Sequence, residues 1–260
     1  MISFVIIGKN EGERLEKSIL SVLNVIKLDY IKESEIIYVD SNSSDDSLSI
    51  AKSMGVRTFL ITGECNAAIA RNIGAKESKG DILFFLDGDM EILPGFLHNI
   101  IKDGNMIYPF VSGIFDDVVY NQEWEYQHTS RRIKLNEGDA DLIEYTTGGL
   151  FIIERALWEK VGGMDSRFTK SQDYDLGLRL AKLGIPLHRK AILLAKHHTV
   201  SYYRRKWNPS IKKYASLIFR KHLLNPYCYE TVIRGQYTSI ALLISICMSV
   251  ISPSFLLLYF

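Results

Sequence analysis

The sequence predicts an α/β fold with a mostly parallel, Rossmann-like sheet that is flanked by helices. Strand and helix patterns alternate through the first half of the chain, which is typical of a parallel sheet with helices on both faces. The segment Ile82–Leu86 is a run of five apolar residues bounded by Gly80-Asp81 and Gly88, as expected for a strand buried on both faces. Three predicted strands end in polar clusters, and such sheets bind ligands beyond the carboxyl ends of their strands.

The first half contains four predicted strands and three predicted helices. In the first helix, apolar residues such as Leu15, Ile19 and Val22 recur at helical spacing, and Gly55 can end the second helix. The predicted strands are Ile2–Ile7, Glu35–Val39, Arg57–Ile61 and Ile82–Leu86, and the predicted helices are Gly12–Ile26, Ser44–Met54 and Glu64–Ser78.

The second half is less regular. We expect Met106–Phe115 to be a strand at an edge of the sheet, because Pro109 cannot donate to a neighbouring strand. The polar and aromatic segment Asn121–Asp141 is expected to be a mobile loop. The remaining predicted elements are a strand at Gly148–Ile153 and helices at Glu154–Val161 and Asp173–Leu183.

Composition limits the class of protein. The chain has 260 residues and a net charge of +1, so no global field favours nucleic acid or another polyanion as partner. The three cysteines, Cys65, Cys228 and Cys247, have no metal-ligand spacing, which suggests free thiols in a reducing compartment. The short apolar run after Met1 has no basic residues before it and is expected to be a strand, not a signal peptide.

The C-terminal part differs from the rest. We divide the chain into a globular domain (1–200), a basic amphipathic juxtamembrane segment (201–234) and an apolar segment (235–260). Residues 201–234 contain eight Lys and Arg against one acid, and 235–260 contain no charge. Residues 240–260 are numerous enough to cross a bilayer, and the basic segment before them fits a protein at the cytoplasmic face of the cell membrane. The alternatives are an interfacial piece and a buried helix with an apolar tail.

Asp87-Gly88-Asp89 follows the buried strand directly. In extended chain, residues two apart point the same way, and glycine between them allows a ligand to approach the backbone. Two carboxylates on one side suit Mn²⁺ or Mg²⁺, and such an ion can bridge them to a diphosphate and stabilise its departure. The alternative is a surface turn, since Asp-Gly is a common turn dipeptide.

Four motifs in order resemble glycosyltransferase family 2, whose members have the GT-A fold. They are VDSNSSDDS (39–47), ARNIGAKESKGDILFFLDGDM (70–90), TTGGLFIIERALWEKVGGMDSRF (146–168) and QDYDLGLRLAKLG (172–184), and the resemblance covers residues 2 to 200. It implies a glycosyltransferase of hexosyltransferase type that uses Mn²⁺ or Mg²⁺. The enzyme would move a sugar, with inversion, from a nucleotide-diphosphate donor such as a UDP-sugar to a hydroxyl. The acceptor would be a glycan or lipid-linked sugar in cell-surface polysaccharide or glycolipid synthesis.

The resemblance implies a nucleotide site at the ends of the first strands. Asp40, in the slot of the family's V-D-D-G-S-T-D motif, would hydrogen-bond the base, and Asp87 would contact the ribose. Arg71 would lie near the base or the diphosphate, or would be a plain surface residue of its helix. The other positions at which family members contact base and ribose hold Ile7, Lys9 and Glu11. Asp45 is expected to stabilise the start of the next helix.

The resemblance also implies a metal site. Asp89 would be a direct ligand, with Asp87 beside it. His197 would complete the metal shell or touch the donor phosphates, since neutral imidazole is a reasonable ligand. A structural role is the alternative for His197.

On the acceptor side, the resemblance implies that Gly148 and Gly149 shape the sugar site. Gln172-Asp173 matches an acidic pair of the family, in which Asp173 would be the general base that takes the acceptor proton. Gln172 replaces the commoner acid and carries no charge. The alternative for Asp173 is a first-turn acid of the helix, and Asp175 is expected to be solvated.

Three other functions stay open. A processive polysaccharide synthase would carry Q-x-x-R-W, which Tyr203-Arg204-Arg205-Lys206-Trp207 matches poorly. A sugar-1-phosphate nucleotidyltransferase would need a glycine-rich loop after the first strand, where this chain has GKNEGER. A non-catalytic scaffold on a degenerate transferase domain is the third.

Overall fold

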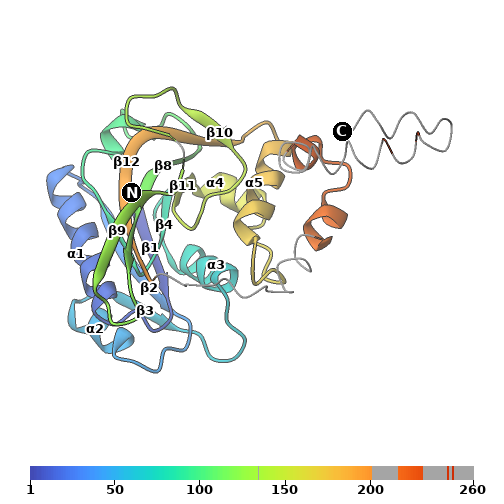
Figure 1. Cartoon of the computed structure of the whole chain (residues 1–260). Helices are drawn as coiled ribbons and strands as arrows, with labels where there is room; N and C mark the ends of the chain where they lie inside the picture. Colours follow the sequence, from blue (N-terminus) through green and yellow to red (C-terminus); the bar gives the residue numbers. More distant parts are fainter. Residues whose placement is uncertain (134, 201–215, 231–244, 246–247, 249–260) are drawn as a thin grey trace. The chain divides into compact units, whose positions relative to one another are not determined.

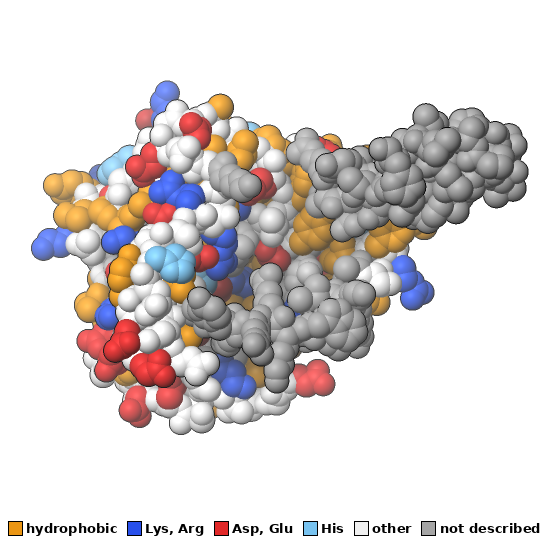
Figure 2. Space-filling model, viewed as in Figure 1, with side chains coloured by type: hydrophobic (Ala, Val, Ile, Leu, Met, Phe, Trp, Pro, Cys, Tyr) orange, Lys and Arg blue, Asp and Glu red, His pale blue; other side chains and the backbone are white. Residues whose placement is uncertain are grey.

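The computed structural model describes residues 1–133, 135–200 and 216–230, together with residues 245 and 248. The chain divides into two compact units, Met1–Ala215 and Ser216–Phe260. The first unit is built on a ten-stranded sheet whose main order is β10-β12-β8-β11-β4-β1-β2-β3. Lys, Arg, Asp and Glu side chains are interspersed over the face of the first unit seen in Figure 2, in keeping with the net charge of +1.

The predicted parallel half is confirmed. Strand β1 lies between β2 and β4, and β3 extends the sheet beyond β2, all in parallel. The helices between them cover both faces, with α1 and α2 on one side and α3 on the other (Figure 1). The strands are β1 (Ile2–Gly8), β2 (Ser34–Asp40), β3 (Arg57–Leu60) and β4 (Ile82–Asp87); the helices are α1 (Glu13–Leu28), α2 (Ser47–Ser53) and α3 (Ala67–Glu77).

The other half makes the sheet mixed, so the prediction of a mostly parallel sheet is wrong there. Strand β11 (Phe151–Glu154) runs antiparallel to both β4 and β8 (Phe110–Tyr120). The long strand β12 (Leu187–Val200) is parallel to β8 and antiparallel to β5 and β10. The remaining elements are β5 (Met90–Ile92), η1 (Leu97–Asn99), β6 (Ile101–Lys102), β7 (Asn105–Met106), β9 (Tyr126–Arg131), β10 (Leu142–Glu144), α4 (Arg155–Lys160) and α5 (Gln172–Lys182).

Two expectations for this half are corrected. Pro109 precedes β8 and does not lie in it, so the strand keeps its donors and runs inside the sheet between β12 and β11. The carbonyl of Pro109 still accepts a bond from the Glu154 N–H, at 3.0 Å. The segment expected to be a loop contains β9, which pairs with β8 as an antiparallel hairpin.

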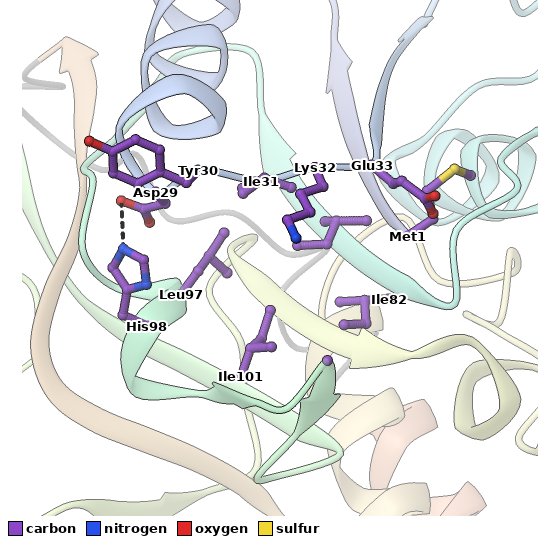
Figure 3. Close-up of a pocket in the computed structure, with 12 residues that line it drawn as sticks. Met1, Asp29, Tyr30, Ile31, Lys32, Glu33, Ile82, Leu97, His98 and Ile101 are labelled. Atoms are coloured by element: carbon purple, nitrogen blue, oxygen red, sulfur yellow. Dashed lines mark ion pairs between the residues drawn. The ribbon is translucent and has the colours of Figure 1, made fainter.

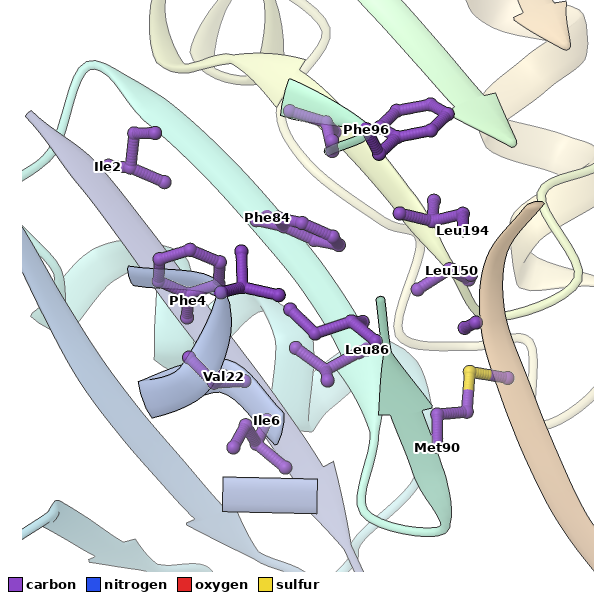
Figure 4. Close-up of a cluster of buried hydrophobic side chains, with 14 of the residues drawn as sticks. Ile2, Phe4, Ile6, Val22, Phe84, Leu86, Met90, Phe96, Leu150 and Leu194 are labelled. Carbon is purple, nitrogen blue, oxygen red and sulfur yellow. The ribbon is translucent and has the colours of Figure 1, made fainter. Parts of the chain in front are cut away.

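Two hydrophobic layers sandwich the sheet. On the α1 side, the rings of Phe4 and Phe84 pack at a tilt, with centroids 5.2 Å apart, near Leu86 and Val22 (Figure 4). On the α3 side, Phe85 packs against Phe151 and Trp158. Burial of such side chains contributes about 1.5–3 kcal/mol each. The strands are therefore fixed firmly, and they hold the loops at their carboxyl ends in place.

The second unit is helical at 216–221 and 226–230, where Ile218 and Cys228 are buried. Among the described residues, no helix combines the length and apolar character needed to cross a membrane. The predicted basic segment overlaps this unit at 216–230. Apart from residues 245 and 248, the predicted apolar segment lies outside the described residues.

Candidate active site

The carboxyl ends of β1, β2 and β4 meet at one edge of the sheet, as expected. In the strand register, Ile7 lies beside Asp87 and Gly8 lies beside Asp40. The Gly88 N–H donates to the Ile7 carbonyl at 2.8 Å, which binds the turn after β4 to the end of β1. Two predicted carboxylates, Asp87 and Asp40, are thus brought to the strand ends on either side of β1.

Arg71 on α3 reaches the first of these carboxylates. Its side chain is only 2% exposed, so the surface alternative for Arg71 is wrong. Nη2 lies 2.5 Å from Asp87 Oδ1 and 3.2 Å from the Gly149 carbonyl oxygen, whereas Nε is buried and has no hydrogen-bond partner among the described residues. Burial raises the pKa of Asp87 above its usual range; Arg71 opposes this rise, and the charge of Asp89 adds to it.

Gly149 must be glycine for this arrangement. Its φ of +92° lies in the left-handed region, and an added Cβ would stand 2.4 Å from Asp87 Oδ2. Gly148 also has a positive φ, of +67°, and its N–H donates to Asp173 Oδ2 at 3.0 Å. The predicted glycine pair therefore connects Asp87 on one side with Asp173 on the other.

Asp173 lies in the first turn of α5. Besides the Gly148 N–H, its Oδ2 accepts the Thr146 hydroxyl at 2.6 Å, and Oδ1 has no hydrogen bond to the described residues. Next to it, Gln172 Oε1 is buried and has no hydrogen-bond partner in the described part of the chain. The expectation that Asp175 is solvated is wrong: it is fully buried and paired with Arg179 Nε at 2.9 Å. Asp175 is therefore structural.

Asp89 and His197 form the part of the site that can hold a metal. His197 Nε2 lies 3.3 Å from Asp89 Oδ2, because the pairing of β12 with β5 sets His197 opposite Met90. Asp89 Oδ1 is buried, and none of the described residues donates a hydrogen bond to it, as suits an atom that can bind a metal. Burial lowers the pKa of His197, but its hydrogen bonds to Asp89 and Asp117 raise it to a net value above the ordinary one.

The predicted set of Asp87, Asp89 and His197 is not assembled in full. Asp87 pairs with Arg71, and no three His, Cys, Asp or Glu side chains among the described residues are arranged to hold a metal together. Two protein ligands are still consistent with Mn²⁺ or Mg²⁺, since such ions keep several positions for water and phosphate oxygens.

The remaining predicted residues surround the β1 loop. Glu11 pairs with Arg14 at 2.9 Å, and burial, with a contribution from Asp89, raises the pKa of Glu11 to about 7. Lys9 is exposed.

The Asp40 carboxylate is fully buried. It accepts the Tyr38 hydroxyl at 2.9 Å and the Ser43 N–H at 2.7 Å, so its visible role is to hold the loop after β2. Asp45 accepts bonds from Ser47 at the start of α2, as expected.

Sequence reasoning missed two residues of this region. Asp117 lies 2.7 Å from His197 Nδ1, and buried Arg189 donates to the Thr146 carbonyl at 2.9 Å. A charged pair at 116–117 on a strand beside the two histidines was a usable signal for Asp117. Nothing local distinguishes Arg189, whose partners come from two separate segments, 112–113 and 144–146.

A separate cavity of about 400 Å³ lies at the opposite, amino end of the sheet (Figure 3). Apolar side chains such as Leu97 and Ile101 line it. Asp29 accepts the Gly95 N–H at 2.8 Å and lies 3.7 Å from His98 Nε2. None of the predicted site residues lines this cavity.

Fold and site together define an α/β enzyme with a GT-A type mixed sheet and a carboxylate-rich carboxyl edge. The family model described as glycosyl transferase family 2 matches residues 3–162. The chain therefore belongs to this family and is a glycosyltransferase.

Curated relatives agree. The chain is 28% identical over 154 residues to an uncharacterized glycosyltransferase of Haemophilus influenzae, a match that covers 56% of this chain and 51% of the relative. It is 29% identical to human polypeptide N-acetylgalactosaminyltransferase 13, covering 63% of this chain and 35% of that enzyme. It is 26% identical to the amylovoran biosynthesis glycosyltransferase AmsB of Erwinia amylovora, covering 82% and 74%. The match thus spans about half the length of the Haemophilus influenzae relative and about a third of the length of the human enzyme.

Solved structures share the fold. Residues 1–349 of S. aureus TarS superpose with a TM-score of 0.61 at 16% identity, covering 76% of this chain and 60% of that one. The TarS structure in complex with UDP gives a TM-score of 0.64 at 15% identity, covering 85% and 65%.

Proposed function

We propose that the chain is a metal-dependent glycosyltransferase that moves a sugar, with inversion, from a UDP-sugar to a hydroxyl of a glycan or lipid-linked acceptor. The observation that carries the proposal is where the buried polar atoms without a hydrogen bond lie among the described residues. Seven buried side-chain atoms of the described residues lack a hydrogen bond, and those of Glu11 and His198 have ion-pair partners. Three of the other five are Arg71 Nε, Asp89 Oδ1 and Gln172 Oε1. Buried polar groups are normally satisfied, so a cluster of exceptions indicates a ligand site.

Each of the three suits a different part of a sugar nucleotide. Arg71 Nε is a cationic donor for diphosphate or base oxygens. Asp89 Oδ1 and His197 Nε2 are oxygen and nitrogen ligands for Mn²⁺ or Mg²⁺, which would neutralise the charge of the departing diphosphate. Gln172 Oε1 accepts a sugar hydroxyl without adding charge beside Asp173.

Asp173 is the proposed general base. The acceptor oxygen bonds to the anomeric carbon while the bond from that carbon to the diphosphate breaks. The hydroxyl proton passes to the carboxylate of Asp173, whose Oδ1 has no other hydrogen bond among the described residues. Thr146 and Gly148 hold Oδ2, so the carboxylate is oriented before the acceptor binds.

UDP is the proposed donor nucleotide because the TarS structure of the same fold is a complex with UDP. The acceptor proposal is supported by two relatives whose names give a polymer or its biosynthesis: the amylovoran biosynthesis glycosyltransferase AmsB and the poly(ribitol-phosphate) β-N-acetylglucosaminyltransferase TarP. We place the enzyme at the cytoplasmic face of the cell membrane, because basic residues in 201–234 precede the uncharged residues 235–260.

Thermal unfolding with UDP, GDP, CDP, ADP and dTDP, each with and without Mn²⁺, tests the proposal. Ligand at a hundred times its dissociation constant stabilises the fold by about 2.7 kcal/mol. We expect UDP to raise the melting temperature only when Mn²⁺ is present. Asp89→Asn should abolish this shift, and Glu33→Gln, at an exposed residue by the cavity at the opposite end of the sheet, should keep it. No shift with any nucleotide would contradict the proposed donor site.

A further inference from the structure

His197 has a second carboxylate neighbour, on the side away from Asp89. Strands β8 and β12 run in parallel with Asp117 directly beside His197. Asp117 Oδ1 lies 2.7 Å from Nδ1 of the imidazole ring, while Nε2 faces Asp89 at 3.3 Å. Both side chains are largely buried, at 17% and 13% exposure. The ring is therefore held between two carboxylates, one on each nitrogen.

Neighbouring residues of the same strands point to the other face of the sheet, as alternation along a strand requires. Asp116 pairs with Arg131. His198 contacts the Tyr120 hydroxyl at 2.9 Å and Glu91 at 2.8 Å. The two Asp and two His residues thus separate into a pair beside the Asp89 side chain, Asp117 and His197, and a pair with other side-chain partners, Asp116 and His198.

We propose that Asp117 is a positioning residue of the metal centre: it accepts the Nδ1–H of His197 and so presents the Nε2 lone pair to a divalent ion held by Asp89. The inference rests on the metal dependence proposed above. A metal-bound histidine typically donates its other ring N–H to a carboxylate, which fixes both tautomer and ring orientation. Here the carboxylate comes from a strand 80 residues away in sequence.

Arg132 orients Asp117 in turn. Its Nε donates to Asp117 Oδ2 at 3.0 Å, and its Nη2 lies 2.9 Å from Asp117 Oδ1. The guanidinium lies over the Phe115 ring, 5.2 Å from its centroid. Nη2 is also 3.0 Å from His197 Nδ1. Since both this nitrogen and a protonated Nδ1 are donors, the shared Asp117 Oδ1 is the acceptor that can satisfy the two together.

This arrangement predicts a specific defect in Asp117→Asn. Arg132 offers only donors, so the single amide oxygen of the new side chain turns to Arg132 and its NH₂ group turns to His197 Nδ1. The ring must then carry its proton on Nε2, where it blocks the metal. Asp117→Ala removes the acceptor but lets water replace it, so this variant should be less impaired than Asp117→Asn.

Mn²⁺ binding, followed by the electron paramagnetic resonance signal of the free ion in the presence of UDP, tests the inference on the whole chain. We expect 10–100-fold weaker binding in Asp117→Asn, the range typical of such partners of metal ligands. The matched variant Asp116→Asn should bind Mn²⁺ as the unmodified protein does. Melting temperatures without metal show that each variant is folded.

A spectroscopic readout separates positioning from general loss of structure. Electron spin echo modulation detects ¹⁴N of an imidazole bound directly to Mn²⁺. The modulation should be present in the unmodified protein and in His198→Ala, absent in His197→Ala, and strongly reduced in Asp117→Asn. If the unmodified protein binds no Mn²⁺, the proposed metal dependence fails. If it binds Mn²⁺ and Asp117→Asn retains full affinity and modulation, only the inference about Asp117 is overturned.

Discussion

Arg71 and Arg189 are both almost completely buried, and both donate to the loop that precedes β11. Arg71 binds the Gly149 carbonyl at one end of the loop, and Arg189 binds the Thr146 carbonyl at the other. A buried guanidinium is costly unless its donors are paired. Both arginines therefore need an explanation, and their partners differ.

Arg189 uses all three of its nitrogens. Its Nε donates to Glu144 at 2.7 Å, its Nη1 to Ser112 Oγ and the Gly113 carbonyl at 2.9 Å, and its Nη2 to the loop. Within the described residues, Arg71 makes hydrogen bonds only through Nη2, and its Nε is left without a partner. The comparison teaches that a satisfied buried arginine holds the fold, whereas an incompletely satisfied one retains donors for a ligand.

The strongest test of this comparison compares two carboxylates of α5, Asp173 and Asp175. Asp173 accepts hydrogen bonds from the loop that lies between the two arginines. Asp173→Asn should lower the transfer rate by about 10²–10⁴, the usual contribution of a general base, because the amide cannot take the acceptor proton. The melting temperature should change little, since the amide oxygen still accepts from Thr146 and Gly148. Sugar transfer and thermal unfolding measure the two effects.

Asp175→Asn, two residues further along the helix than Asp173, is the contrasting variant, because it breaks the buried pair with Arg179. The main effect of Asp175→Asn should be a loss of stability. Full transfer activity in Asp173→Asn would refute the assignment of the base.

Arg189→Met tests the structural side. Removal of one partner of a buried ion pair typically costs about 3–5 kcal/mol, and here Ser112 and two carbonyls also lose their donor. We expect a loss of about 3 kcal/mol in the free energy of unfolding, because Glu144 is partly exposed and regains water. Urea denaturation measures it. A stability within about 0.5 kcal/mol of the unmodified protein would show that the satisfied arginine does not hold the fold.

Arg71→Met tests the ligand side. Asp87 is about one third exposed (34%), so it can be hydrated when Arg71 is lost, and stability should fall less than in Arg189→Met. Affinity for UDP should fall about 10–100-fold, equivalent to about 1.4–2.8 kcal/mol. Calorimetric titration with UDP and Mn²⁺ measures the affinity. Unchanged affinity together with a large loss of stability would place Arg71 in the structural class with Arg189.

The sequence predicted the features that depend on local interactions and missed those that depend on contacts between residues distant in sequence. The strands β1 to β4 and their helices were predictable because periodicity and apolar runs are local signals. Asp87, Asp89 and Asp173 were predicted as site residues through motifs at strand and helix ends, and their roles stay predictions. The mixed half was not predicted, because β8, β11 and β12 pair through contacts distant in sequence, and alternation alone does not give the direction of a strand.

Burial of charged side chains was also beyond the sequence. Arg71 and Asp175 lie on helices that also carry exposed residues, and the pattern alone gave no reason to place them inside. Their burial depends on Asp87 and Arg179, together with loop carbonyls that only the tertiary fold supplies. The contact of Asp117 with His197 is of the same kind, since it joins two strands 80 residues apart.

A third arginine–carboxylate pair extends the comparison to an arginine that is exposed. Arg57, 45% exposed, lies 2.7 Å from Glu35 Oε2, while Glu35 Oε1 accepts from the Ser3 hydroxyl and the Lys79 N–H. Burial raises the pKa of Glu35, but these hydrogen bonds and Arg57 together lower it by more, so the net pKa is below the ordinary value. A depressed pKa means that the ionised carboxylate stabilises the folded state.

Glu35→Gln should therefore cost about 1 kcal/mol of unfolding free energy at pH 7, because hydrogen bonds to a charged group are lost and the exposed ion pair adds little. The contribution is complete above the unfolded-state pKa of about 4.5 and disappears as the pH falls through the lower folded-state pKa. Urea denaturation of both proteins between pH 3 and pH 7 measures the difference, with exposed Glu33→Gln as control. If the difference in unfolding free energy persisted unchanged at pH 3, Glu35 would act through its shape and not its charge. The pair with Arg57 would then hold the fold as the partners of Arg189 do.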